Sequence, residues 1–259
     1  MFSAFRDGAL SFGLFLGMLL FMEIGRRIRL SQSARDPDVT KSGFGAIEGG
    51  VLGLLGLLLA FTFSGAGTRF DGRRQLIVEE TNAIGTAYLR LDMLSTAAQP
   101  NLRESFRRYL DARLNVYRKL PDIEGAKQEL SIANSLQQEI WREAIASLRT
   151  SAAPLEVAVV LLPALNAMID ITTTRTMAVY VHPPVIIFVM LFALAWVSSL
   201  LAGYDMASGK LRSWFHMLCF ATAVAVTVFV ILDLEYPRTG LIRVNAFDQA
   251  LVELRESMK

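Results

Sequence analysis

The segment from residue 49 to residue 67 combines a long apolar run with a row of small side chains. The small residues recur at steps of three or four positions, which places them on one side of an α-helix. In a bilayer such a row lets another helix approach closely, because lipid gives helices no hydrophobic reason to associate. We call this row the small-residue seam and expect it to pack tightly in a membrane assembly. Its members are Gly49, Gly53, Gly56, Ala60, Ser64 and Gly67.

Composition excludes several classes of protein. Of the 259 residues, 53% are hydrophobic and 19% are charged, which is too apolar for an ordinary soluble domain. A single cysteine, Cys219, excludes an internal disulfide, and only two histidines are present, too few for a typical zinc site with it. The net charge of +2 gives no basis for binding nucleic acid. We therefore expect no metal and no cofactor.

Four runs of the chain are candidates for crossing a bilayer, which takes about 20 apolar residues. The fold class expected is all-α, an integral membrane protein with four transmembrane helices and a helical soluble insert between the second and the third. An even number of spans places both termini and the insert on one side. The four runs are residues 8–22, 47–66, 185–202 and 214–232.

The same runs set the expected domain boundaries. Residues 1–67 form the first transmembrane helix pair, 68–184 the helical soluble domain, 185–233 the second transmembrane pair and 234–259 a C-terminal tail. Within the insert, apolar residues at helical spacing predict helices over residues 69–95, 101–120, 124–150 and 154–180. Pro121 and the pair Pro183-Pro184 end two of these helices.

The side of the membrane on which the insert lies stays open. The first connection is basic, and by the positive-inside rule it favours a cytoplasmic position, which would make the insert and the termini extracytoplasmic. Basic residues after the second and fourth spans nearly cancel this bias. The basic residues of the first connection are Arg26, Arg27, Arg29, Arg35 and Lys41.

Four stretches of sequence are similar to one membrane protein family. They read GLLLAFTF at 56–63, RFDGRR at 69–74, EETNAIGTAYLR at 79–90 and DLEYPRTG at 233–240. The chain resembles the bacterial bestrophin-like domain family along nearly its whole length. Bestrophins themselves are pentameric anion channels with four membrane helices and a cytosolic helical region. The resemblance therefore implies a homo-oligomer, such as a pentamer, and a cytosolic insert, against the charge count.

A polar stripe follows the seam. Glu79, Asn82, Thr86 and Arg90 recur at steps of three and four, so they share one helical face that would line an ion vestibule. The alternative is a solvated face stabilised by local contacts. Glu80 lies about 100° around the helix from Glu79, so the two carboxylates need no common role. No nucleophile or metal set accompanies them, and we expect no catalytic residues and no enzyme.

Two further groups of charged residues are pore or membrane candidates. In a symmetric assembly Arg69, Arg73 and Arg74 would each become a positive ring that attracts anions. Alternatively, their long basic side chains only anchor the helix at the interface. Glu23 and Glu48 are carboxylates near the membrane boundary, where such groups are functional candidates or pair with nearby arginines.

These observations predict an oligomeric ion channel of the bacterial inner membrane, anion-selective if the arginine rings line it. The competing hypothesis is a non-conducting membrane scaffold or sensor whose helical insert binds a partner. The partners expected are the lipid bilayer, further copies of the same chain and inorganic ions.

Overall fold

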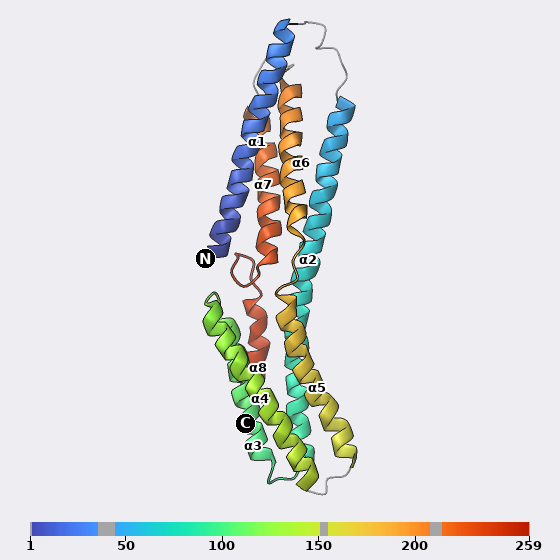
Figure 1. Ribbon diagram of the computed structural model, residues 1–259, viewed down its shortest axis with the longest axis vertical. Coiled ribbons are helices and arrows are strands. Elements are labelled where there is room, and N and C mark those ends of the chain that lie inside the picture. The colour runs from blue at the N-terminus through green and yellow to red at the C-terminus, as the bar shows by residue number, and fades with distance from the viewer. Residues whose placement is uncertain (1, 36–44, 151–154, 208–213, 259) are drawn as a thin grey trace. The chain divides into compact units, whose positions relative to one another are not determined.

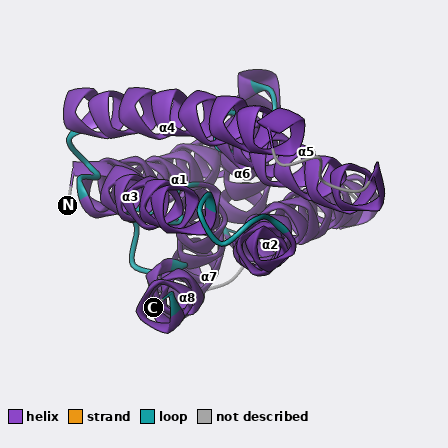
Figure 2. Ribbon diagram, turned by 90° about the horizontal axis from the view of Figure 1, so that it is seen from below, coloured by secondary structure: helices purple, strands orange, loops and turns teal. Residues whose placement is uncertain are grey.

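The computed structural model describes residues 2–35, 45–150, 155–207 and 214–258, and these residues form helices and loops without a strand (Figure 1, Figure 2). The all-α fold predicted from the sequence is confirmed. Lys41, one of the basic residues of the first connection, lies outside the described residues. The helices are α1 (Phe2–Arg35), α2 (Gly45–Leu89), η2 (Arg90–Met93), α3 (Gln99–Arg118), α4 (Ile123–Thr150), α5 (Leu155–Ala178), α6 (Val185–Met206), α7 (Trp214–Glu235), η3 (Asn245–Asp248) and α8 (Gln249–Ser257).

Five helices of the described chain are long and apolar enough to cross a membrane. They are α1, α2, α5, α6 and α7. Four of them contain the runs predicted from the sequence. The fifth, α5, was placed within the soluble insert, so length and composition give one candidate span more than the four expected.

The chain divides into two compact units. Unit 1 consists of Met1–Arg69 and His182–Ile242, and unit 2 of Phe70–Val181 and Arg243–Lys259. Helix α2 contributes residues to both. The last residues of the sequence, expected to form a tail, include η3 and α8, which belong to unit 2.

In unit 1, α1 packs against both α6 and α7 (Figure 1). Apolar residues at helical spacing on each of these helices meet in one core, to which α2 adds Leu55. Buried members from α1, α6 and α7 include Leu14, Met18, Met22, Leu191, Ala195, Ala221, Val224 and Val228.

Helices α1 and α6 approach each other closely at two glycines. A Cβ atom added to Gly25 would lie 2.0 Å from the carbonyl oxygen of Leu200, and one added to Gly203 would lie 2.0 Å from that of Met22. Both distances are far below van der Waals contact, so the two backbones touch where no side chain fits. This contact was not predicted from the sequence.

In unit 2, the core forms between the second half of α2, the helices α3, α4 and α5, and the C-terminal segment. The apolar spacing noted for the insert predicted part of it correctly, since Phe106, Leu110 and Ile140 are all fully buried. From the C-terminal segment, Leu251 is fully buried as well, and Arg255 of α8 pairs with Asp111 of α3 at 2.8 Å. Helix α8 is therefore an integral part of this unit.

The close approach of α1 and α6 makes Gly203 intolerant of any side chain. Gly203→Ala should destabilise unit 1 by about 1–3 kcal/mol or more, because the added methyl group overlaps backbone atoms that cannot move independently. Gly13→Ala on α1 is the matched control, since nothing lies within 4 Å of its added Cβ. The melting temperature of each variant is measured in detergent as the temperature at which the monodisperse fraction of the protein is lost. Equal melting temperatures for the two variants would refute the contact.

Candidate functional site

One face of α2 is buried along the helix. In unit 1 its buried residues are apolar or small, and in unit 2 a charged residue, Glu80, joins them. The positions recur at multiples of the helical repeat, which is the pattern of a helix packed on one side. They are Leu55, Thr62 and Ala66 in unit 1, and Ile77, Glu80, Ile84, Ala87 and Tyr88 in unit 2.

The small-residue seam lies away from this buried face. Its first five members are exposed and Gly67 is partly exposed. No described atom outside the helix's own backbone approaches within 4 Å of a Cβ added to Gly49, Gly53, Gly56 or Gly67. Between the small residues stand large apolar side chains, including Phe61, which is 69% exposed. A surface built for close helix packing is therefore left uncovered by the described residues of the chain.

The polar stripe is only partly a shared exposed face. Glu79, Asn82 and Thr86 are exposed on α2, and the Glu79 carboxylate accepts a hydrogen bond of 3.2 Å from the Gln75 side chain. Arg90 behaves differently, because its guanidinium donates to the backbone carbonyl of Val160 on α5 at 2.6 Å. Three of the four predicted residues thus remain candidates for lining a vestibule, and Arg90 is tied to the fold.

Arg69 is engaged within unit 1. Its Nε donates to Glu235 Oε1 at 2.9 Å, at the end of α7. Glu235 is only 2% exposed, and its second oxygen lies 3.2 Å from Nδ1 of His182. Arg69 therefore has a carboxylate partner and lies in line with the buried positions of α2.

The other two arginines belong to unit 2 and are engaged there. Arg73 donates to the backbone carbonyls of Ala178 at 3.2 Å and Val181 at 2.9 Å. Arg74 pairs with Asp71 at 2.8 Å, and its guanidinium lies 4.3 Å from the centre of the Phe247 ring. Each of the three arginines thus has partners within its own unit.

The two carboxylates near the membrane boundary differ. Glu23 accepts hydrogen bonds of 2.9 and 2.8 Å from Arg26 and one of 2.8 Å from Arg27, which favours a structural role. Glu48 lies partly buried in the first turn of α2.

A buried charge cluster in unit 2 was not predicted from the sequence. Glu80 is fully buried and accepts hydrogen bonds from Arg113 Nε at 2.6 Å and from Arg175. Arg175 also pairs with Asp248 at 3.0 Å, which ties η3 to the cluster. Burial alone raises the pKa of the Glu80 carboxyl, but the two guanidinium groups outweigh it and hold that pKa below its usual value.

A neutral hydrogen-bond network occupies the same core. Tyr109 and Thr172 share a hydrogen bond of 2.8 Å, and the Gln137 amide donates to both, at 3.1 and 3.0 Å. Burial raises the pKa of Tyr109 to about 12, so its hydroxyl stays neutral at physiological pH. For the buried Glu80, the sequence did offer one signal. Glu80 lies one helical turn from both Ile77 and Ile84, so it shares their buried face of α2.

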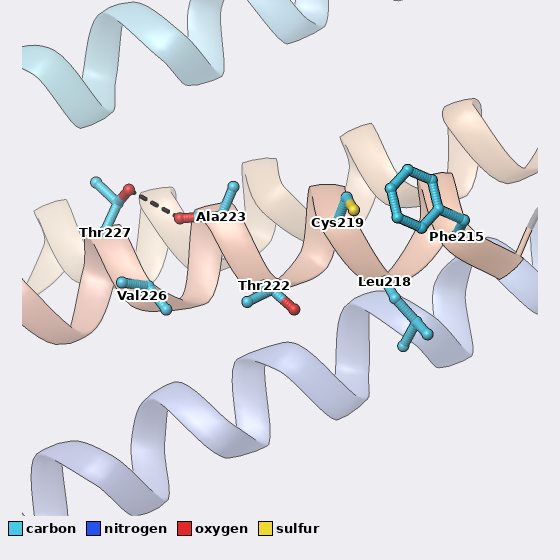
Figure 3. A pocket seen from close by; sticks show the side chains of 7 residues that line it. All are labelled: Phe215, Leu218, Cys219, Thr222, Ala223, Val226 and Thr227. Carbon is cyan, nitrogen blue, oxygen red and sulfur yellow. Dashed lines mark hydrogen bonds between the residues drawn. The ribbon is translucent and has the colours of Figure 1, made fainter.

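An open hollow lies on the exposed side of α7 (Figure 3). Its lining comes from one helix and is mostly apolar or small. The Thr227 hydroxyl donates a hydrogen bond of 2.8 Å to the backbone carbonyl of Ala223. Within the described residues no group of three or more metal-ligating side chains occurs either there or elsewhere. The lining residues are Phe215, Leu218, Cys219, Thr222, Ala223, Val226 and Thr227.

Comparison with known proteins agrees with this architecture. The family model described as the bestrophin-like domain matches residues 12–246. No curated protein matches the chain. The long apolar helices and the family match define a multi-pass membrane protein. The chain belongs to the bestrophin-like domain family.

Solved structures share the fold over nearly the whole chain. One single-residue variant of a bacterial bestrophin homologue from Klebsiella pneumoniae has a TM-score of 0.69 and 13% identity, with 95% of this chain and 98% of that chain covered. Another variant of a Klebsiella pneumoniae homologue has a TM-score of 0.70 and 15% identity, with 94% and 99% covered. A structure described as a membrane protein has a TM-score of 0.65 and 14% identity, with 93% and 98% covered. Identities this low establish a common fold alone.

The Glu80 cluster should dominate the stability of unit 2. Glu80→Gln leaves two buried guanidinium groups short of their shared anion and should cost about 3–5 kcal/mol. Because the folded-state pKa is lowered, this stabilisation is present above the unfolded pKa, about 4.3 for Glu, and is lost as the pH falls through the folded value.

Hydrogen exchange of peptides from α3 and α5 in the full-length protein measures this loss. Glu79→Gln is the matched control, because its exposed side chain should change stability by less than about 0.5 kcal/mol. Equal protection in the two variants would contradict the account of the cluster.

Proposed function

We propose that the protein is an oligomeric ion channel of the bacterial inner membrane. The observation that carries this proposal is the small-residue seam of α2, which the part of the chain that the structure describes leaves exposed. In a bilayer such a surface suits another helix better than lipid tails, because small residues permit close backbone contact. Further copies of the same chain are its natural occupants, and membership of the bestrophin-like family supports a conducting assembly.

The membrane topology we propose has four spans: α1, the first part of α2, α6 and α7. Helix α5 then belongs to a soluble helical domain with the rest of the insert, between the first and second transmembrane pairs. Its buried face supports this, since Thr172 and Arg175 there bind polar and charged partners rather than apolar neighbours. We place the insert and both termini in the cytosol, following the family resemblance.

The assembly proposed is a closed homo-oligomeric ring, with five copies as the resemblance implies. In a ring, the same face of α2 recurs around the axis, so every exposed side chain on it is repeated once per copy. The seam then supports packing between neighbouring copies in the membrane. The exposed Glu79, Asn82 and Thr86 are the vestibule candidates outside it.

The charges on this face favour cations. Arg69, Arg73 and Arg74, the residues on which anion selectivity would depend, are engaged by a carboxylate, backbone carbonyls and Asp71. Glu79 is an exposed carboxylate on the polar part of α2, and a ring of carboxylates attracts cations. Anion selectivity through Arg69 has weaker support, because it needs that guanidinium to leave the buried carboxylate of Glu235.

The competing function is a non-conducting scaffold or sensor whose insert binds a partner. In that case the seam serves only to hold copies together, and Glu79 is one of several solvated positions. The two functions differ in one property, the passage of ions through a purified oligomer.

Currents through purified oligomer in planar bilayers test the proposal. In a salt gradient the reversal potential of the wild-type current should lie toward the equilibrium potential of the cation. Glu79→Lys should shift the reversal potential toward that of the anion. The shift should weaken as salt rises, because the Debye length is about 10 Å at 0.1 M. Glu124→Lys makes the same charge change at an exposed site on α4, where Glu124 pairs with Lys127, and should leave selectivity unchanged.

Three results would count against parts of this proposal. A well-folded oligomer without current would favour the scaffold. Currents with the same selectivity in Glu79→Lys would remove Glu79 from the pathway. A wild-type channel selective for anions would restore the arginines as the residues to test.

A further inference from the structure

The carboxylate of Glu235 is shared by two basic side chains from different parts of unit 1. Arg69 of α2 donates from Nε at 2.9 Å to Oε1 and 3.2 Å to Oε2. His182, which precedes α6, places its Nδ1 3.2 Å from Oε2. Glu235 is 2% exposed, whereas the His182 side chain is 30% exposed and can exchange protons with water. We call these three residues the Glu235 triad.

The charge of the Glu235 triad depends on the protonation of His182. A carboxylate next to Nδ1 favours the tautomer with the proton on that nitrogen, which then donates to Glu235. With His182 neutral, one carboxylate and one guanidinium sum to zero. When a proton from water binds Nε2, the triad carries one net positive charge, and His182 competes with Arg69 for the same carboxylate.

Several charged groups of unit 1 on α1 and α7 have partners of their own. Tyr236 lies against the imidazole, with 4.9 Å between ring centres, and carries the Arg6 guanidinium at 4.6 Å from its ring. Arg6 pairs with Asp7 on α1 at 3.1 Å. Asp233 on α7 accepts hydrogen bonds from the backbone amides of Leu241 and Ile242. Compared with the arginine, aspartate, glutamate and tyrosine side chains named here, histidine is the type that ordinarily changes charge between pH 5 and 8.

We propose that His182 is the proton sensor of the channel: its protonation adds one positive charge per copy beside α2 and lowers the preference for cations. This inference rests on the proposed function. Because each copy contributes one triad, a single titrating group changes the charge of a whole ring. Glu235 acts as the positioning residue, since its carboxylate holds the side chains of Arg69 and His182 next to each other.

Proton uptake can be measured without any current. The chain has only two histidines, so His216→Gln leaves His182 as the one imidazole in the spectrum of the full-length protein. Nitrogen-15 NMR in detergent, recorded at stepwise lower pH from about 8 to about 5, follows proton uptake at Nε2 of His182, with Nδ1 expected to stay protonated. An imidazole that stays in one protonation state across this range would overturn the proposal.

The effect on selectivity is measured by reversal potentials at about pH 8 and about pH 5, the limits of the ordinary range of histidine. The cation-to-anion permeability ratio of the wild type should fall about twofold or more at the lower pH, which is the effect of one added charge at about 10 Å in water. His182→Gln should abolish this fall, and His182→Lys should keep the low ratio at both pH values.

His216→Gln is the matched control, because His216 lies in the first turn of α7, where its ring contacts Phe215. It should retain the full pH dependence. An unchanged wild-type ratio, or a fall that persists in His182→Gln, would overturn the sensor while leaving the channel in place. A protein that titrates normally but carries no current would overturn the proposed function and, with it, the sensing of conduction.

Discussion

The buried face of α2 determines which of its side chains remain available to other molecules. This face contributes Leu55 to the core of unit 1, and Ile77 and Ile84 to that of unit 2. Once it is packed, the seam and the polar positions Asn82 and Thr86 are left exposed on the same helix. A helix in a bilayer satisfies its backbone internally, so its exposed side chains alone decide what it binds. The proposed channel follows from that division.

Ion pairing decides which charges can act on ions. Glu80 and Glu235 are buried carboxylates, and each is held by arginines from other segments. Removing one partner of such a pair is costly, because the other charge is left buried without compensation. Arg69, one of the arginines that the sequence suggested for a pore, is therefore committed to structure, whereas Glu79 is exposed. His182 is the exception that couples a structural carboxylate to the pH.

Local periodicity explains what the sequence predicted and what it did not. The helical spacing of apolar residues predicted the all-α fold and the burial of Phe106 and Ile140, because that spacing is a property of each helix alone. The contact at Gly203 escaped prediction, because it depends on a second helix more than 170 positions away in the chain. The partners of Arg69 and Glu80 escaped for the same reason. The family resemblance, in contrast, rested on contiguous motifs and is confirmed.

A cryo-EM reconstruction of the detergent-extracted assembly tests the central claim most directly. We predict several copies around an axis, with the seam residues Gly53, Gly56 and Ala60 covered by a neighbouring copy. Four helices of each copy should lie within the micelle, with α5 outside it. A particle in which the seam faces detergent at the periphery, or a single isolated chain, would contradict the account.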